Sequence, residues 1–161
     1  MKIPVMIVED EAIVSMEISS YLEELGYEVI AVVDNALDAY NNALKYEPHI
    51  ILMDIKIKGE EDGIDAAVKI LKEVDTTIIY LTAYCDEQTV ERAVKTNPSA
   101  YLTKPFKEQE LFASLKMASF TYSKKENICS LKRGDIIFDD EFSFESEKEQ
   151  LIYCNEYLHL T

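Results

Sequence analysis

The sequence predicts an α/β protein built on a doubly wound, five-stranded parallel sheet and followed by a short C-terminal antiparallel β extension. Up to about residue 121, short β-branched runs alternate with longer segments in which apolar residues recur at helical spacing. The runs are too short for buried helices and lack strict apolar–polar alternation, which is typical of strands buried on both faces. Beyond residue 122 only short alternating runs remain, and these predict the extension.

The predicted strands are separated by segments of helical period. In the first such segment apolar residues recur at steps of three and four, and Gly26 follows as a stop signal. Asp86 is suited to cap the fourth helix, and Pro105 stands just ahead of the fifth. The expected strands are Ile3–Val8, Glu28–Val33, Ile50–Met53, Thr77–Leu81 and Ala100–Thr103. The expected helices cover residues 13–25, 36–46, 64–74, 86–96 and 107–120.

The tail of the chain has a different character. Residues 122–127 form a short, polar stretch of mixed charge, which we interpret as a linker between a domain of residues 1–121 and a β-rich extension of residues 128–161. Asn155 and Glu156 fit a hairpin turn between two apolar-rich runs. The strands expected in the extension are Asp135–Phe138, Phe142–Ser146, Gln150–Cys154 and Tyr157–Leu160.

The charge excludes one class of function for this chain. It carries 31 acidic and 16 basic residues among 161, a formal net charge of −15, and a nucleic-acid backbone repels such a chain unless basic residues cluster. They do not, since there are 22 acidic and 11 basic residues up to residue 121 and nine and five after it. No apolar run approaches the ~20 residues of a membrane span. Because the three cysteines form no CxxC pair, we expect a cytoplasmic protein without structural disulfides or zinc.

Polar side chains follow four of the predicted strands directly. Because the carboxyl ends of parallel strands meet at one edge of a sheet, these side chains should converge there. They are Glu9, Asp10, Asp54, Thr82 and Lys104. Carboxylates crowded together repel one another unless a cation shares the site, so the acids predict a divalent ion with oxygen ligands, most simply Mg²⁺.

With the metal placed, Asp54 on the central strand remains as a nucleophile. A carboxylate that attacks phosphorus forms an aspartyl phosphate. The transferred phosphoryl group spreads negative charge over its oxygens, and Mg²⁺, the Lys104 ammonium and the Thr82 hydroxyl could stabilise that charge. Taken singly, Glu9 and Asp10 could equally cap the following helix, and it is the combination of groups that favours phosphoryl chemistry.

The same residues lie in motifs that resemble the receiver domain of two-component response regulators. The motifs are Val8-Glu9-Asp10-Glu11, Leu52-Met53-Asp54, Asp62-Gly63, Leu81-Thr82-Ala83 and Tyr101-Leu102-Thr103-Lys104-Pro105-Phe106, and the resemblance covers residues 3 to about 120. It implies a flavodoxin-like fold in which Asp54 accepts a phosphoryl group from a histidine kinase. It also implies that Asp10 binds Mg²⁺ with help from Glu9, and that the backbone carbonyl of Lys56 is a further metal ligand.

The resemblance implies roles for other residues as well. Thr82 and Tyr101 would form the conformational switch, and the peptide bond before Pro105 would be cis. Lys56 and Tyr84 lie two positions beyond Asp54 and Thr82, where they would influence the lifetime of the phosphoryl group. Such a protein is not an enzyme in the usual sense, since it assists only its own phosphorylation and dephosphorylation. A homodimer would form through residues 86–120.

One departure from the family pattern stands close to the phosphoacceptor. Many receivers carry a Pro four residues after it, whereas this chain has Lys58 there in a longer, charged loop. The exposed positions Met16, Glu17 and Ser20 on the first helix are candidates for contact with a kinase. A phosphatase-type hydrolase is disfavoured, because Lys56 stands where such enzymes place a second Asp.

The tail loosely resembles the opening of a winged-helix effector domain. On that interpretation the protein regulates transcription, and this chain stops before a recognition helix could begin, so that DNA binding needs a further C-terminal domain. The alternative is a receiver that acts as a protein-interaction module through its β extension. A basic helix-turn-helix downstream of Thr161 would favour the first interpretation.

Overall fold

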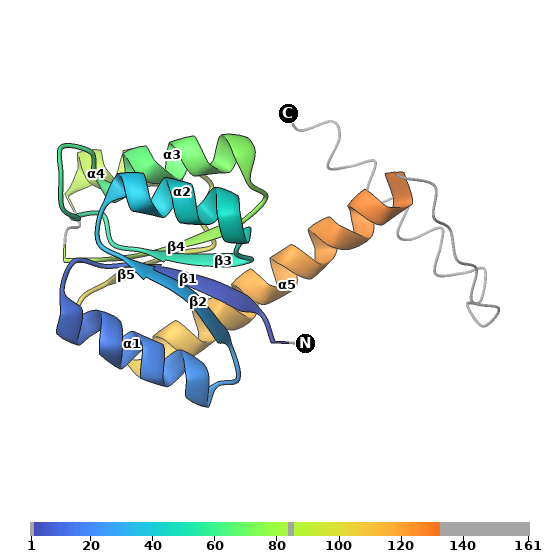
Figure 1. The fold of residues 1–161 in the computed structure, drawn as a ribbon, viewed down its shortest axis with the longest axis horizontal. Helices are drawn as coiled ribbons and strands as arrows, with labels where there is room; N and C mark the ends of the chain where they lie inside the picture. The colour runs from blue at the N-terminus through green and yellow to red at the C-terminus, as the bar shows by residue number, and fades with distance from the viewer. Residues whose placement is uncertain (1, 84–85, 133–161) are drawn as a thin grey trace. The chain divides into compact units, whose positions relative to one another are not determined.

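The chain forms the expected five-stranded parallel sheet with helices on both faces. The computed structural model describes residues 2–83 and 86–132 (Figure 1). The strands are β1 (Pro4–Val8), β2 (Glu28–Val33), β3 (Ile50–Met53), β4 (Thr77–Thr82) and β5 (Ala100–Thr103). The helices are α1 (Ala12–Glu24), α2 (Ala36–Tyr46), α3 (Gly63–Glu73), α4 (Glu87–Val94) and α5 (Glu108–Lys132).

The strand order is β2-β1-β3-β4-β5, with all neighbours parallel. After β1 the chain adds β2 on one side and then crosses to add β3 on the other. In a doubly wound sheet the connections that leave such a pair diverge, and they open a crevice at the carboxyl ends of the two strands. The crevice here lies between the ends of β1 and β3, which Glu9 and Asp54 follow directly.

Two apolar cores lie on opposite faces of the sheet. Alternate residues of each central strand enter opposite cores because successive side chains of a strand point to opposite faces. Met6 and Ile51 pack with α2 and α3, whereas Ile7 and Leu52 pack with α1 and α5. The central strands β3 and β4 are buried along their whole length, as the absence of alternation in their sequences predicted. Figure 1 shows α2 and α3 above the sheet and α1 below it.

Local signals place the helix ends where the sequence predicted them. Gly26 follows α1 with φ +85°, a left-handed conformation that is energetically unfavourable for any residue with a side chain. Its N–H donates a hydrogen bond to the Glu23 carbonyl oxygen at 3.0 Å, which ends the helix. Asp86 caps α4, since its side chain accepts a hydrogen bond from the Thr89 N–H at 3.0 Å. The Lys104–Pro105 peptide bond is cis, as expected.

The last helix differs from the prediction. It was expected over residues 107–120, but α5 continues to Lys132 through the segment 122–127 that we interpreted as a linker. Residues 128–132, where the predicted β extension begins, also belong to this helix. The polar stretch is rich in Lys and Glu, which have high helix propensity, and this composition does not end a helix. The strands expected between Asp135 and Leu160 lie outside the described residues.

The chain divides into two units after Asn127, and the features below all lie in the first unit. Within the described part of the chain, no helix has both the length and the apolar character that a membrane span requires.

Candidate functional site

Hydrogen bonds of the sheet fix the backbone of the first residue beyond β1, β3 and β5. The Glu9 N–H donates to the Val33 carbonyl at 2.9 Å, the Asp54 N–H to the Val8 carbonyl at 2.8 Å, and the Lys104 N–H to the Thr82 carbonyl at 2.8 Å. Side chains on such backbone are held in place by the sheet itself. The pairing of the strands therefore brings Glu9, Asp54 and Lys104 together at the carboxyl edge, as predicted.

Three carboxylates meet at this edge. Glu9, Asp10 and Asp54 each offer an oxygen, and these oxygens all lie within 4.8 Å of one another. Glu9 is 3% and Asp54 5% exposed, while Asp10 is half-buried. In an octahedral Mg²⁺ site, ligand oxygens are about 3 to 4 Å apart, so a small adjustment or an intervening water suits these three to the ion.

Lys104 binds two of the carboxylates directly. Its Nζ lies 2.6 Å from Glu9 Oε2 and 2.7 Å from Asp54 Oδ2. Burial acts to lower the pKa of Lys104, but hydrogen bonds to Asp54 and Glu9 outweigh it and raise that pKa above its usual value. Burial also raises the pKa of Glu9, and the hydrogen bond from Lys104 opposes this only in part. The ammonium thus offsets some of the repulsion that three neighbouring acids create.

Other predicted residues surround the cluster. The Lys56 N–H donates to Asp54 Oδ1 at 3.1 Å, which ties the backbone of the β3–α3 loop to the Asp54 side chain. Thr82 is fully buried at the end of β4, and its neighbour Ala83 lines the acidic cleft. Tyr101 is half-buried on β5, with its ring centroid 6.1 Å from that of Tyr80. Tyr84 lies outside the described residues.

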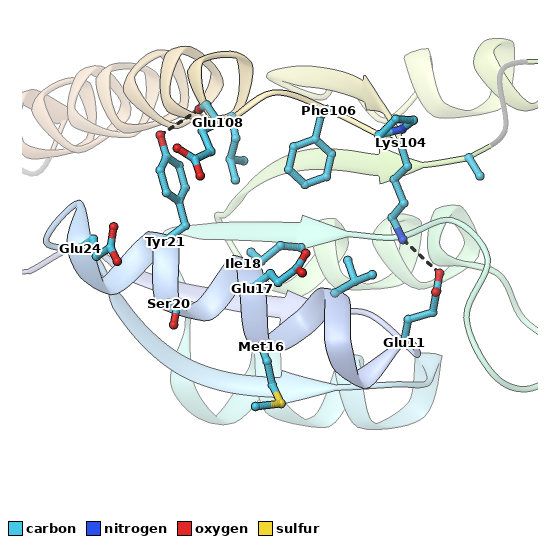
Figure 2. Close-up of a pocket in the computed structure, with 14 residues that line it drawn as sticks. Glu11, Met16, Glu17, Ile18, Ser20, Tyr21, Glu24, Lys104, Phe106 and Glu108 are labelled. Carbon is cyan, nitrogen blue, oxygen red and sulfur yellow. Dashed lines mark hydrogen bonds and ion pairs between the residues drawn. The ribbon is translucent and has the colours of Figure 1, made fainter.

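Asp10 and Asp54 line a cleft of about 320 Å³, which shares lining residues with a larger groove. The cleft is lined by Asp10, Glu11, Asp54, Lys56, Ala83 and Lys104. The groove, of about 1010 Å³, runs between α1 and the segment that leads into α5, and it shares Glu11, Ala83 and Lys104 with the cleft. Figure 2 shows Glu11 and Lys104 at one end of the groove, and Tyr21 and Glu108 at the other.

The structure reveals contacts of the β3–α3 loop that sequence reasoning missed. A Cβ added to Gly63 would lie 2.0 Å from the carbonyl oxygen of Asp54, so only glycine allows α3 to begin this close to the site. Lys58, in the position where many receivers have Pro, bonds to Asp34 through both its N–H, at 3.0 Å to the carbonyl, and its Nζ, at 2.6 Å to Oδ2. The Asp62-Gly63 motif is the signal that could have indicated the first contact, whereas no pattern in the sequence indicated the second.

Comparison with known proteins gives one consistent result. Residues 5–116 match the family model described as the response regulator receiver domain. The chain is 36% identical over 114 residues to the transcriptional regulatory protein PdtaR of Mycobacterium tuberculosis, covering 71% of this chain and 55% of that protein. It is 30% identical over 138 residues to the phosphate regulon transcriptional regulatory protein PhoB of Pseudomonas aeruginosa, covering 84% of this chain and 59% of that protein. The chain thus spans little more than half the length of these curated relatives.

Solved structures agree in fold. The signal receiver domain of a modulated diguanylate cyclase from Desulfovibrio desulfuricans superposes with a TM-score of 0.73 at 34% identity, over 78% of this chain and 99% of that one. A CheY-like receiver domain protein from Methanospirillum hungatei gives a TM-score of 0.70 at 22% identity, over 78% of this chain and 99% of that one, and supports the fold alone.

Proposed function

The chain belongs to the response regulator receiver domain family, and from this premise we propose that it is a phosphorylation-switched signalling protein whose phosphoacceptor is Asp54. The observation that carries the proposal is the arrangement around that side chain. Asp54 lies within 4.8 Å of two further carboxylates and 2.7 Å from the Lys104 ammonium, at the bottom of an open cleft. A carboxylate in such surroundings can attack phosphorus while cations balance the charge of the incoming group.

In the proposed reaction the phosphoryl group moves from a histidine of a kinase to Asp54. The bond between phosphorus and the donor nitrogen breaks as a bond to an Asp54 oxygen forms, and the imidazole leaves with the electron pair. Lys104 is close enough to pair with a phosphoryl oxygen once it gives up its contact with Asp54 Oδ2. On this proposal the chain assists only its own phosphorylation and dephosphorylation.

Mg²⁺ is the cofactor that fits these donors. Asp10, Asp54 and the backbone carbonyl of Lys56 would hold the ion, with Glu9 assisting, since oxygen ligands of this kind suit a hard divalent cation. When bound, the ion would neutralise charge on the transferring group. The chain's own contribution is to hold Glu9 and Asp54 on backbone that is hydrogen-bonded to the sheet, so that these two side chains need little reorganisation.

We further propose that Thr82 and Tyr101 read out phosphorylation. Thr82 ends the strand beside β3, and Tyr101 stands on the next strand, on the face that carries α3 and α4. A pull of the phosphoryl group on Thr82 would be followed by inward movement of the half-buried Tyr101 ring, which shifts the population between two surfaces. Lys56 at the cleft and Tyr84 remain the residues expected to set the lifetime of the phosphoryl group.

The partner that delivers the phosphoryl group is proposed to dock in the α1 groove. This groove meets the acidic cleft at Glu11 and Lys104, so a protein seated there can reach Asp54. Met16, Glu17 and Ser20, the positions predicted to face a kinase, all line it, and Met16 is 71% exposed. The position of this groove beside the acidic cleft is consistent with a histidine kinase as the partner.

For the protein to which this chain belongs, we propose transcriptional output and a cytoplasmic location. The named relatives PdtaR and PhoB are transcriptional regulatory proteins, which supports this output. A homodimer through residues 86–120 would transmit the switch, and DNA binding would need a further effector domain. The second candidate is a protein-interaction module that binds its partner through a β extension. The coding sequence downstream of Thr161 distinguishes it from a transcriptional regulator, which would have a DNA-binding domain there.

The direct test uses Mg²⁺, the small donor phosphoramidate and intact mass. Wild type should gain the mass of one phosphoryl group, and Asp54→Ala should gain none. Asp34→Ala serves as the matched control, because this Asp lies outside the cleft and should leave the gain intact. A wild-type chain that stays at its original mass, or an Asp54→Ala chain that gains it, would contradict the proposal.

A further inference from the structure

The start of α3 is locked to the backbone of the phosphoacceptor. The Gly63 N–H donates to the Ile55 carbonyl at 2.7 Å, and the missing side chain of Gly63 leaves just enough room for the Asp54 carbonyl oxygen. The two backbone segments are in direct contact with no free space between them. A displacement of Gly63 must therefore also move the peptide that joins Asp54 to Ile55.

Asp62 fixes that helix start from the other side. Its Oδ1 accepts hydrogen bonds from the N–H groups of Ile64 and Asp65, both at 2.9 Å. Its own N–H lies 3.4 Å from Asp65 Oδ2, which completes a capping box. Asp62 therefore moves with α3 and Gly63 as one unit.

A side chain from α4 holds both carboxylates of this box. Arg92 Nη1 lies 2.7 Å from Asp62 Oδ2, and Nη2 lies 3.1 Å from Asp62 Oδ1 and 3.0 Å from Asp65 Oδ1. A guanidinium that grips a carboxylate with two parallel bonds fixes direction as well as distance. Burial acts to raise the pKa of Asp62, but the hydrogen bond from Arg92 and the capping contacts hold it below the usual value, so the carboxylate stays charged.

The helix that carries Arg92 buries little of its surface against the described residues. The buried residue of α4 is Ala93, and a hydrogen bond of 2.9 Å joins Thr96, just beyond the helix, to the hydroxyl of Tyr80. A short helix with so little buried surface takes its position from polar contacts to a larger extent than α2 or α3 do.

We propose that Arg92 is a positioning residue, which couples the placement of α4 to Asp54 through Asp62 and Gly63. The inference rests on the proposed function, because the coupling matters only if Asp54 is the phosphoacceptor. It differs from the Thr82–Tyr101 switch, since it runs through α3 and not through β4 and β5. Coupling between two positions is reciprocal, so phosphorylation should move α4, and loss of the bridge should alter the loop at Asp54.

The test compares wild type with Arg92→Ala, Arg92→Lys and the matched control Lys69→Ala. Lys69 pairs with Glu61 at 2.6 Å, so its removal breaks an exposed ion pair of the same loop and helix but leaves α4 untouched. Amide hydrogen exchange is followed at α4, at Lys56 and at Gly63, with and without phosphoramidate and Mg²⁺, and the amides of α1 report global stability. The rate of phosphoryl gain is measured by mass.

In wild type and Lys69→Ala, phosphorylation should change exchange across α4. In Arg92→Ala that response should disappear, exchange at Gly63 and Lys56 should rise without any donor, and phosphoryl gain should slow by roughly threefold to tenfold. Arg92→Lys should restore the response in part, because an ammonium reaches one carboxylate but lacks the fork.

Two results separate this inference from the proposed function. An Arg92→Ala chain with wild-type exchange at Gly63 and a wild-type α4 response overturns the coupling, even if Asp54 takes the phosphoryl group normally. A wild-type chain that gains no mass overturns the proposed function, whereas faster exchange at Gly63 in Arg92→Ala, with α1 unchanged, would still support the coupling.

Discussion

Gly63 packs directly against the backbone carbonyl of Asp54, so its missing side chain matters both for stability and for the site. Gly63→Ala should lower the free energy of unfolding by about 3 kcal/mol, because the new Cβ would overlap the Asp54 carbonyl and force α3 away. Phosphoryl gain at Asp54 should fall with it, since the displaced carbonyl belongs to the proposed phosphoacceptor itself. Denaturant unfolding and mass measurement together check both effects.

Gly26→Ala is the control for this substitution. Gly26 has φ +85° but no atom within 4 Å of an added Cβ, so alanine there should cost only roughly 1 to 2 kcal/mol of backbone strain. Phosphoryl gain should be unchanged. Equal losses of stability at the two glycines would contradict the steric explanation for Gly63.

Tyr80 predicts a defined dependence of stability on alkaline pH. Burial raises the pKa of Tyr80 to about 12, and the hydrogen bond with Thr96 opposes this only in part. Because the folded-state pKa lies above the reference value of 10.0, the contribution is fully present below about pH 10 and is lost as pH rises toward 12. The stability lost over the whole titration, from below pH 10 to above pH 12, is on the order of 2 to 3 kcal/mol.

The comparison of wild type with Tyr80→Phe isolates that contribution. Phenylalanine cannot ionise, and the other tyrosines titrate in both chains. At neutral pH wild type should be more stable by about 1 kcal/mol, the value of the lost hydrogen bond. Denaturant unfolding from pH 8 to 11 should show this advantage shrinking above pH 10, and a constant difference would refute the assignment.

Sequence reasoning succeeded for residues whose position follows from a strand end. Glu9, Asp54 and Lys104 were predicted to converge because parallel strands end at one edge, and the structure brings them to within hydrogen-bond distance. The bridge of Arg92 to Asp62 was not predictable in this way. A contact across 30 residues between two helices leaves no periodic signal, since it depends on how the helices are turned on the sheet.

At the scale of the element, strand β4 begins with a buried hydroxyl group that makes no hydrogen bond to the described residues. Thr77 is 6% exposed, and its hydroxyl has no hydrogen-bond partner among the described residues. Thr77→Val keeps the shape and β-branching but removes the buried polar group, so the free energy of unfolding should rise by about 1 kcal/mol. Thermal unfolding measures this directly.

Thr96→Val is the contrasting variant. Its hydroxyl lies 2.9 Å from that of Tyr80, so the same chemical change removes a hydrogen bond and should destabilise the protein by about 1 kcal/mol. The opposite signs at these two threonines are the prediction. A loss of stability in both variants would mean that the Thr77 hydroxyl is satisfied in solution.

Element types were predicted better than element ends. The five strands and the first four helices match the expected ranges closely, because apolar periodicity and caps mark them. The length of α5 escaped prediction, because the polar stretch after residue 121 contains neither Gly nor Pro to end the helix. Polarity alone indicates exposure to water, which a helix tolerates as well as a linker does.

For the whole molecule, the cluster of three carboxylates at the sheet edge predicts that Mg²⁺ stabilises the fold. At a hundredfold excess over its dissociation constant, the ion should add about 2.7 kcal/mol to the free energy of unfolding. Asp10→Asn should abolish most of this gain while raising the melting temperature of the metal-free chain, because it relieves repulsion among the three carboxylates.

NaCl at matched ionic strength is the control. The chain carries a net charge of −15, so any salt screens its overall self-repulsion to some degree. Only the difference between MgCl₂ and NaCl reports the site. If that difference is the same in wild type and Asp10→Asn, the acidic cluster does not bind the ion.

The sheet also separates the proposed docking groove from the Arg92 bridge. The groove proposed for the phosphoryl donor lies on the α1 and α5 face, whereas the Arg92 bridge lies on the α3 and α4 face, and the two apolar cores keep these faces separate. Substitutions on α1 should therefore change recognition of the proposed donor without disturbing the Arg92 bridge, and the reverse should also hold. On the two proposals, donor recognition and the Arg92 coupling can be changed independently, and the residues at the carboxyl edge are common to both.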